Sequence, residues 1–148
     1  VAIFTCVVTT RKSTNSSAII SEDPCDAAAH TCLFLEKVKE WVQDNIAVYP
    51  HVTYVSLGAA SHFKNRYQLH QFAKNNCPQA RWLFSSSGHY KNACDGFGGL
   101  VKHQAMLNNP RERPINAIQT ARTMVSVLSE KLKGVYLVYL YENKIVRY

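Results

Sequence analysis

Apolar residues along the chain fall into two patterns, short β-branched runs and longer stretches with helical spacing. The short runs predict strands at Val1–Thr10, Ser17–Ser21, Val52–Leu57, Ala80–Ser85 and Val135–Tyr141, with a further short run at residues 145–148. The helical spacing predicts helices at Ala27–Val48, Ala59–Asn76, Asp95–Asn109 and Ile115–Lys133. Clusters of polar residues with Gly or Pro separate most of these segments, as expected for turns and loops.

This order predicts an α/β fold in one domain covering residues 1–148. Two strands joined by the turn at Arg11–Ser16 come first, and helices and strands alternate after them. Such an order favours a mixed sheet flanked by helices. The apolar strand Val135–Tyr141 fits two positions, the centre of the sheet or an edge that is used for pairing.

Residues 89–102 hold the densest group of candidate functional side chains. They follow the strand Ala80–Ser85 and a Ser-Gly break, and they contain Gly96, Gly98 and Gly99 close together. Asp95 is placed where a helix is expected to begin. A polar cluster after the carboxyl end of a strand is a usual place for function in α/β proteins. A capped helix with a glycine-rich start explains the same pattern equally well.

The balance of charge favours acidic partners. The formal net charge is +7 and the isoelectric point is about 9.3, which is typical of proteins that bind nucleic acid but also fits a solvated basic face. The candidate phosphate-binding residues are Lys64, Arg66, Lys91, Lys102, Arg111 and Arg113, with aromatic side chains between them.

The cysteines indicate the oxidation state of the thiols, and the lengths of the apolar runs argue against a membrane span. The chain has 5 cysteines and no pair with C-x-x-C spacing, which favours reduced thiols in the nucleus or cytoplasm over a disulfide framework. His89 and Cys94 are candidate zinc ligands together with other His and Cys residues. No apolar run reaches the ~18 residues of a membrane span, so no membrane partner is expected. The start at Val1, without Met, leads us to expect a fragment of a longer chain.

Two segments together resemble the DDE/D class of eukaryotic DNA transposases. Residues 56–65 read Ser-Leu-Gly-Ala-Ala-Ser-His-Phe-Lys-Asn, beside a family pattern close to Ser-Asp-Gly-x-x-Ser-Gln-Phe-Lys-Asn. Residues 89–102 resemble the family pattern His-Gly-Lys-Gly-x-x-Asp-Gly-x-Gly-Gly-x-x-Lys. The resemblance extends over most of residues 1–108 and implies an RNase H-like fold, whose first strand and first catalytic carboxylate then precede Val1.

The resemblance also implies phosphodiester chemistry at two divalent metals, which this sequence does not match well. Leu57 occupies the position of the second carboxylate, and a leucine cannot ligate Mg²⁺. Tyr90 replaces a family glycine, and only Asp95 matches a candidate third carboxylate. Glu22, Asp23 and Asp26 lie at another strand end, where capping of the following helix is expected.

These observations lead to one main hypothesis and three alternatives. The main hypothesis is a catalytically inactive, transposase-derived domain in the nucleus that binds nucleic acid or a nuclear protein, with Asp95 as a vestigial catalytic residue and no cofactor. The alternatives are an active nuclease or transposase core using Mg²⁺ or Mn²⁺, an oligomerisation or protein-interaction module, and a fold stabilised by Zn²⁺.

Overall fold

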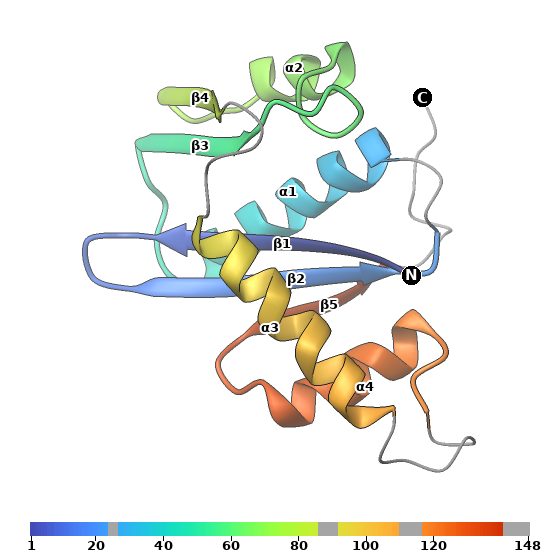
Figure 1. Cartoon of the computed structure of the whole chain (residues 1–148). Helices are drawn as coiled ribbons and strands as arrows, with labels where there is room; N and C mark the ends of the chain where they lie inside the picture. The colour runs from blue at the N-terminus through green and yellow to red at the C-terminus, as the bar shows by residue number, and fades with distance from the viewer. Residues whose placement is uncertain (24–26, 86–91, 110–116, 141–148) are drawn as a thin grey trace. The chain divides into compact units, whose positions relative to one another are not determined.

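The chain forms two compact units. One consists of Val1–Pro24 with Lys91–Lys144, and the other of Cys25–Tyr90 with Ile145–Tyr148. The structure is a computed structural model that describes residues 1–23, 27–85, 92–109 and 117–140. The predicted α/β class is confirmed (Figure 1).

The first unit is built on a three-stranded sheet with the order β1-β2-β5. Strands β1 (Ala2–Thr9) and β2 (Thr14–Ser21) form an antiparallel hairpin, and β5 (Tyr136–Leu140) runs parallel to β2. The hairpin closes between Thr10 and Ser13, where the Thr10 N–H donates to the Ser13 carbonyl at 2.8 Å. In the order β1-β2-β5, the apolar strand β5 lies at the edge of this sheet.

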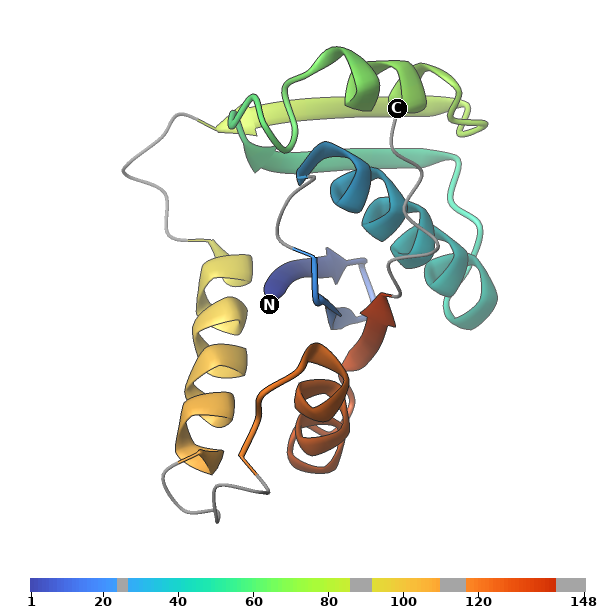
Figure 2. The ribbon, with the colours of Figure 1, turned by 90° about the vertical axis from the view of Figure 1, so that its right-hand side faces the viewer.

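Two helices cover one face of that sheet (Figures 1 and 2). They are α3 (Ala93–Asn108) and α4 (Ala121–Lys131). Ala18 and Ile20, two residues apart on β2, are fully buried and share one cluster with Val101 of α3 and Leu128 of α4. Because alternate residues of a strand point to the same face, this spacing directs both β2 side chains to the helices. Full burial of a side chain such as Leu128 stabilises the fold by roughly 1.5–3 kcal/mol.

Side chains satisfy the first backbone amides of both helices, and one of these side chains comes from a distant segment. The Asn92 side chain accepts from the Asp95 N–H at 3.0 Å, and Asp95 Oδ2 accepts from the Asn92 N–H at 3.2 Å, which is a capping box. Thr120 caps α4, and Glu22 Oε1 accepts from the Ala121 N–H at 2.7 Å. Glu22 therefore joins the end of β2 to the start of α4.

The second unit combines a parallel strand pair with two helices. Strands β3 (His51–Leu57) and β4 (Gln79–Ser85) pair in parallel, and the helices are α1 (Ala27–Asn45) and α2 (Arg66–Ala73). Trp82 of β4 stacks on Tyr54 of β3 with ring centroids 5.4 Å apart, and Phe72 of α2 meets both rings edge-on. Aromatic packing of this kind fastens α2 to one face of the strand pair.

Several predicted boundaries were wrong. The helix expected at Ala59–Asn76 is only α2, because the Asn65 side chain caps it at the Gln68 N–H, 2.9 Å away, and residues before Asn65 form turns. The helix expected at Ile115–Lys133 begins after the Thr120 cap, and the Ile118 N–H instead donates to Asn109 Oδ1 at 2.7 Å. Helix α3 begins with Asn92 as its cap rather than at Asp95. The strand expected at residues 145–148 lies outside the described residues.

The prediction of one domain over residues 1–148 stays a prediction. Each unit has its own internal packing, and the first unit is assembled from two segments that are far apart in the sequence. Among the residues that the structure describes, the mixed sheet is that of the first unit, with antiparallel and parallel neighbours on the two sides of β2.

Candidate functional site

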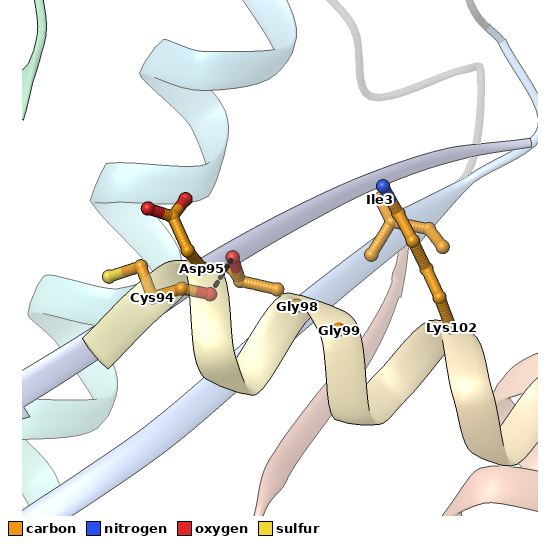
Figure 3. A pocket seen from close by; sticks show the side chains of 7 residues that line it. Ile3, Cys94, Asp95, Gly98, Gly99 and Lys102 are labelled. Atoms are coloured by element: carbon orange, nitrogen blue, oxygen red, sulfur yellow. Dashed lines mark hydrogen bonds between the residues drawn. The ribbon is translucent and has the colours of Figure 1, made fainter. Parts of the chain in front are cut away.

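A pocket lies between β1 and one flank of α3 in the first unit. Its volume is about 290 Å³, and its lining comprises Ile3, Thr5, Cys94, Asp95, Gly98, Gly99 and Lys102. Asp95 and Lys102 project from the same flank of α3, with Gly98 and Gly99 between them (Figure 3). Both charged side chains are exposed to solvent.

Gly98 of α3 lies beside Thr5 of β1 at this pocket. A Cβ atom at Gly98 would lie 3.5 Å from Thr5 Oγ1, which is ordinary van der Waals contact, and one at Gly99 would meet nothing within 4 Å. The Thr5 hydroxyl donates a hydrogen bond to the Cys94 carbonyl at 3.4 Å (Figure 3). The glycines therefore leave open space on the flank of α3 beside β1.

Asp95 has a structural role in this site. Its carboxylate closes the capping box with Asn92, and a negative charge in the first turn also interacts favourably with the helix dipole. The expectation of a vestigial catalytic carboxylate is not tested by this arrangement. The alternative of a capped helix with a glycine-rich first turn agrees with the geometry, although the cap itself is Asn92.

The two thiols next to this site hold their protons tightly. Burial raises the pKa of the Cys94 thiol, a hydrogen bond from the backbone of Val7 opposes the shift, and the charge of Asp95 adds to it. Burial, with a smaller contribution from Cys94, raises the pKa of Cys6 to about 12. A raised pKa keeps both thiols protonated near neutral pH, which disfavours either as a thiolate nucleophile.

The candidate metal ligands do not form a described cluster. His89 lies outside the described residues, and Cys94 is the only one of the two predicted ligands whose position is known. Within the described part of the chain, no group of three or more His, Cys, Asp or Glu side chains is arranged to hold a metal ion.

The predicted phosphate-binding residues are split between the two units. Lys64 and Arg66 belong to the second unit, and Lys102 lines the pocket of the first. Lys91, Arg111 and Arg113 lie outside the described residues. Lys64 and Arg66 are thus near each other in the sequence of the second unit, and Lys102 lines the same pocket as Asp95.

Lys64 and Arg66 stand at the rim of the aromatic cluster of the second unit. The Lys64 ammonium lies 5.8 Å from the centroid of the Phe84 ring. The Arg66 guanidinium lies 4.8 Å from the Tyr67 ring and donates to Tyr67 Oη at 2.8 Å, and this hydrogen bond raises the pKa of Arg66. Both basic side chains are exposed, so each presents its charge to solvent over an aromatic ring.

A long stretch around these residues has no acidic side chain. Between Asp44 and Asp95 there is neither Asp nor Glu, whereas the stretch contains Lys64, Arg66, Lys74, Arg81 and Lys91. The first four are exposed, and none of them forms an ion pair with a carboxylate among the described residues. The second unit therefore carries positive charge that its own side chains do not neutralise.

Leu57 lies at the end of β3, where the resemblance implies a carboxylate. Its side chain is 42% exposed. Val55 and Leu83 on the same side of the β3–β4 pair are also exposed. A leucine here leaves apolar surface in contact with solvent.

Sequence reasoning missed Asn92, Thr5 and the partner of Glu22. Asn followed three residues later by Asp is a capping-box pattern, and it was available in the sequence. The expectation that Glu22 caps the helix after it stays a prediction, and Glu22 bonds the start of α4. A contact between residues 22 and 121 has no local sequence signal.

Among the described residues, no helix has the length and apolar character that crossing a membrane requires. No match was found among curated proteins or among solved structures. A family model described as "Domain of unknown function (DUF8701)" matches residues 1–148, the whole length of the sequence. The chain therefore belongs to this family of domains of unknown function.

Proposed function

We propose that this domain binds nucleic acid through the basic surface of its second unit and does not catalyse phosphodiester chemistry. The observation that carries the proposal is the acid-free stretch between Asp44 and Asp95, which exposes Lys64, Arg66, Lys74 and Arg81. Exposed basic side chains without an ion pair to a carboxylate neutralise phosphates and release condensed counterions, and they give affinity with little dependence on sequence.

The proposal includes descent from an RNase H-like transposase core that has lost its active site. Its support is the antiparallel β1–β2 hairpin followed by α1, β3, α2, β4 and α3 in an alternating order, with β3 parallel to β4. The pairing of β5 with β2 is an addition to that order. Leu57 at the end of β3 supplies no ligand for Mg²⁺ or Mn²⁺, and Asp95 bonds the backbone of Asn92.

DNA binding as a function of salt tests the first part. Fluorescence anisotropy with a short duplex, from low to physiological salt, should give a linear fall of log K with log salt concentration. The double variant Lys64→Ala, Arg66→Ala should bind more weakly on every duplex sequence, with a slope smaller by about two. Adding Lys102→Ala to this variant tests whether the first unit contributes.

The matched control removes the same charge elsewhere. Lys12→Ala with Lys133→Ala changes the net charge equally, and both lysines are exposed in the first unit. Equal weakening by the two double variants would show that only net charge matters. Absence of binding at low salt would rule out the nucleic-acid function.

A cleavage assay tests the second part. The protein is incubated with duplex and single-stranded DNA in Mg²⁺ and in Mn²⁺, and no turnover is expected. Cleavage that Asp95→Ala abolishes, while the variant keeps its circular dichroism spectrum, would instead support the active nuclease.

A further inference from the structure

Helix α2 has one buried face and one exposed face. On the inner side, Gln68 is 1% exposed and the Phe72 ring packs against the aromatic rings of the β3–β4 pair. Residues four apart lie one above the other on a helix, so the outer side carries a single row of polar side chains. This row, called here the α2 stripe, consists of three exposed residues, Arg66, His70 and Lys74.

The α2 stripe carries positive charge that no neighbouring carboxylate neutralises. Within the part of the chain that the structure describes, none of its three side chains forms an ion pair. Arg66 and Lys74 are eight residues apart, which is about 12 Å along the helix axis. A nucleic-acid strand covers this distance with about three to four nucleotides, at roughly 3.4 Å for each phosphate. The charges therefore match the backbone of a short tract of one strand.

An aromatic ring borders the α2 stripe. Tyr67 lies three residues before His70 and seven before Lys74, which places it on the same side of the helix as both. Its side chain is 36% exposed, and the Arg66 guanidinium lies 4.8 Å from the centroid of its ring. Nucleic-acid bases stack on exposed aromatic rings and on guanidinium planes, and Tyr67 with Arg66 supplies both beside the cations.

We propose that the outer face of α2 binds single-stranded nucleic acid, with phosphates along the α2 stripe and one base stacked against Tyr67 and Arg66. The proposal rests on the nucleic-acid function above and specifies its substrate. Positive charge alone attracts a duplex equally well. The bases of a duplex are stacked on one another, whereas a single strand turns a base outward to meet a ring on the protein surface. Tyr67 among the cations therefore favours the single strand.

The first measurement compares single strands with a duplex. The probes are fluorescent oligo(dT) and oligo(rU) of about 12 nucleotides, within the usual site sizes of single-strand-binding domains, and a DNA duplex of equal length. Anisotropy is measured with the intact protein at one salt concentration. At least one single strand should bind about fivefold more tightly than the duplex, and the two oligonucleotides show which sugar the surface accepts.

Two exposed tyrosines of the second unit provide matched variants. Tyr67→Leu should weaken binding of the single strand about fivefold or more and leave duplex binding unchanged. Tyr67→Phe keeps the ring and should bind as the unmodified protein does. Tyr49 is also 36% exposed and belongs to the same unit, so Tyr49→Leu is the control and should have no effect. Circular dichroism spectra confirm that each variant is folded.

Two exposed basic residues test the contribution of the α2 stripe itself. Arg81 precedes Trp82 on β4, and the Trp82 ring contacts α2 through Phe72. Because neighbouring residues of a strand point to opposite faces, Arg81 points away from α2. Lys74→Ala should therefore reduce the slope of log K against log salt for the single strand by about 0.7, and Arg81→Ala should leave it unchanged.

The outcomes separate this inference from the function on which it rests. Duplex binding that equals or exceeds single-strand binding, with the expected salt dependence, overturns the inference and leaves the nucleic-acid function intact. Unchanged single-strand binding in Tyr67→Leu, or equal loss in Tyr67→Leu and Tyr49→Leu, also overturns it. No binding of any probe at low salt overturns the function and the inference together.

Discussion

Gln68 shows how a single buried polar group is left without a partner. Its side chain is 1% exposed, Oε1 accepts a hydrogen bond from the Cys32 thiol at 2.6 Å, and Nε2 has no hydrogen-bond partner. A buried donor without an acceptor costs roughly 1–3 kcal/mol, which makes this residue a local weakness of the second unit.

Replacing Gln68 with methionine should therefore stabilise the protein. Methionine fills a similar volume and removes the unpaired donor, at the loss of one hydrogen bond from Cys32. We expect a gain of about 1 kcal/mol in the free energy of unfolding, measured by urea denaturation. Gln43→Met on the exposed face of α1 is the control and should have no such effect. A loss of stability in Gln68→Met would mean that the amide has a role beyond its bond to Cys32.

Cys6 should make the free energy of unfolding fall at alkaline pH. Its pKa is raised from 9.0 to about 12 in the folded protein, mainly by burial, then by Cys94, against a hydrogen bond with Ser17. The folded state therefore holds this proton more tightly than the unfolded chain does. The contribution to stability is complete below the unfolded pKa of 9.0 and is lost as the pH rises toward about 12.

Urea denaturation at several pH values from 8 upward measures this loss. The free energy of unfolding should fall by at most about 1.4 kcal/mol per pH unit through Cys6, in addition to any other titrating groups. Cys6→Ala should have a shallower fall than Cys77→Ala, the control for loss of a thiol. Identical pH slopes in the two variants would contradict the prediction.

At the scale of elements, the strands were predicted better than the helices. Apolar runs identified β1, β3 and β4 to within a few residues because burial and β-branching mark strands directly. The helix boundaries depended on Asn65, Asn92 and Thr120, whose side chains compete with the backbone for hydrogen bonds. Glycine-rich residues 96–99 lie in α3, as the predicted helix Asp95–Asn109 implied, and the capping box and the buried Phe97 and Val101 hold them there.

The candidate site was predicted only in part. The sequence identifies Asp95, the glycines and Lys102 as neighbours on one helix. It does not identify Ile3 and Thr5, which reach the pocket only because β1 packs against α3 from a distant part of the chain. Packing over such separations has no local signal in a single sequence.

The contact between Glu22 and α4 should contribute measurably to the stability of the first unit. The carboxylate satisfies the first helical N–H and interacts with the helix dipole, so Glu22→Ala should lower the free energy of unfolding by about 1–2 kcal/mol. Urea denaturation gives the value, and Glu130→Ala on the other end of α4 is the control. Equal effects of the two variants would show that the contact contributes nothing beyond charge.

On the scale of the whole molecule, β2 should be the most protected element of the first unit. It is the central strand of the β1-β2-β5 sheet, and Ala18–Ser21 are fully buried in a run. Amides that open only when the unit unfolds exchange most slowly. Native-state hydrogen exchange should therefore find the slowest amides of this unit in Ala18–Ser21, and slower amides in β5 would contradict this.

The parallel pairing of β2 with β5 affects the order in which the two units fold during synthesis. Ser17 pairs with Tyr136 and Ser21 with Leu140, so the sheet joins residues about 120 positions apart in the sequence. During synthesis on the ribosome, the β1–β2 hairpin emerges before β5 and waits without its third strand until residues 136–140 have been translated. Residues 25–90, by contrast, form most of the second unit as one continuous segment and are free to fold in the meantime. We therefore expect that a nascent chain stalled before Tyr136 holds a folded central segment between two ends that have not yet joined.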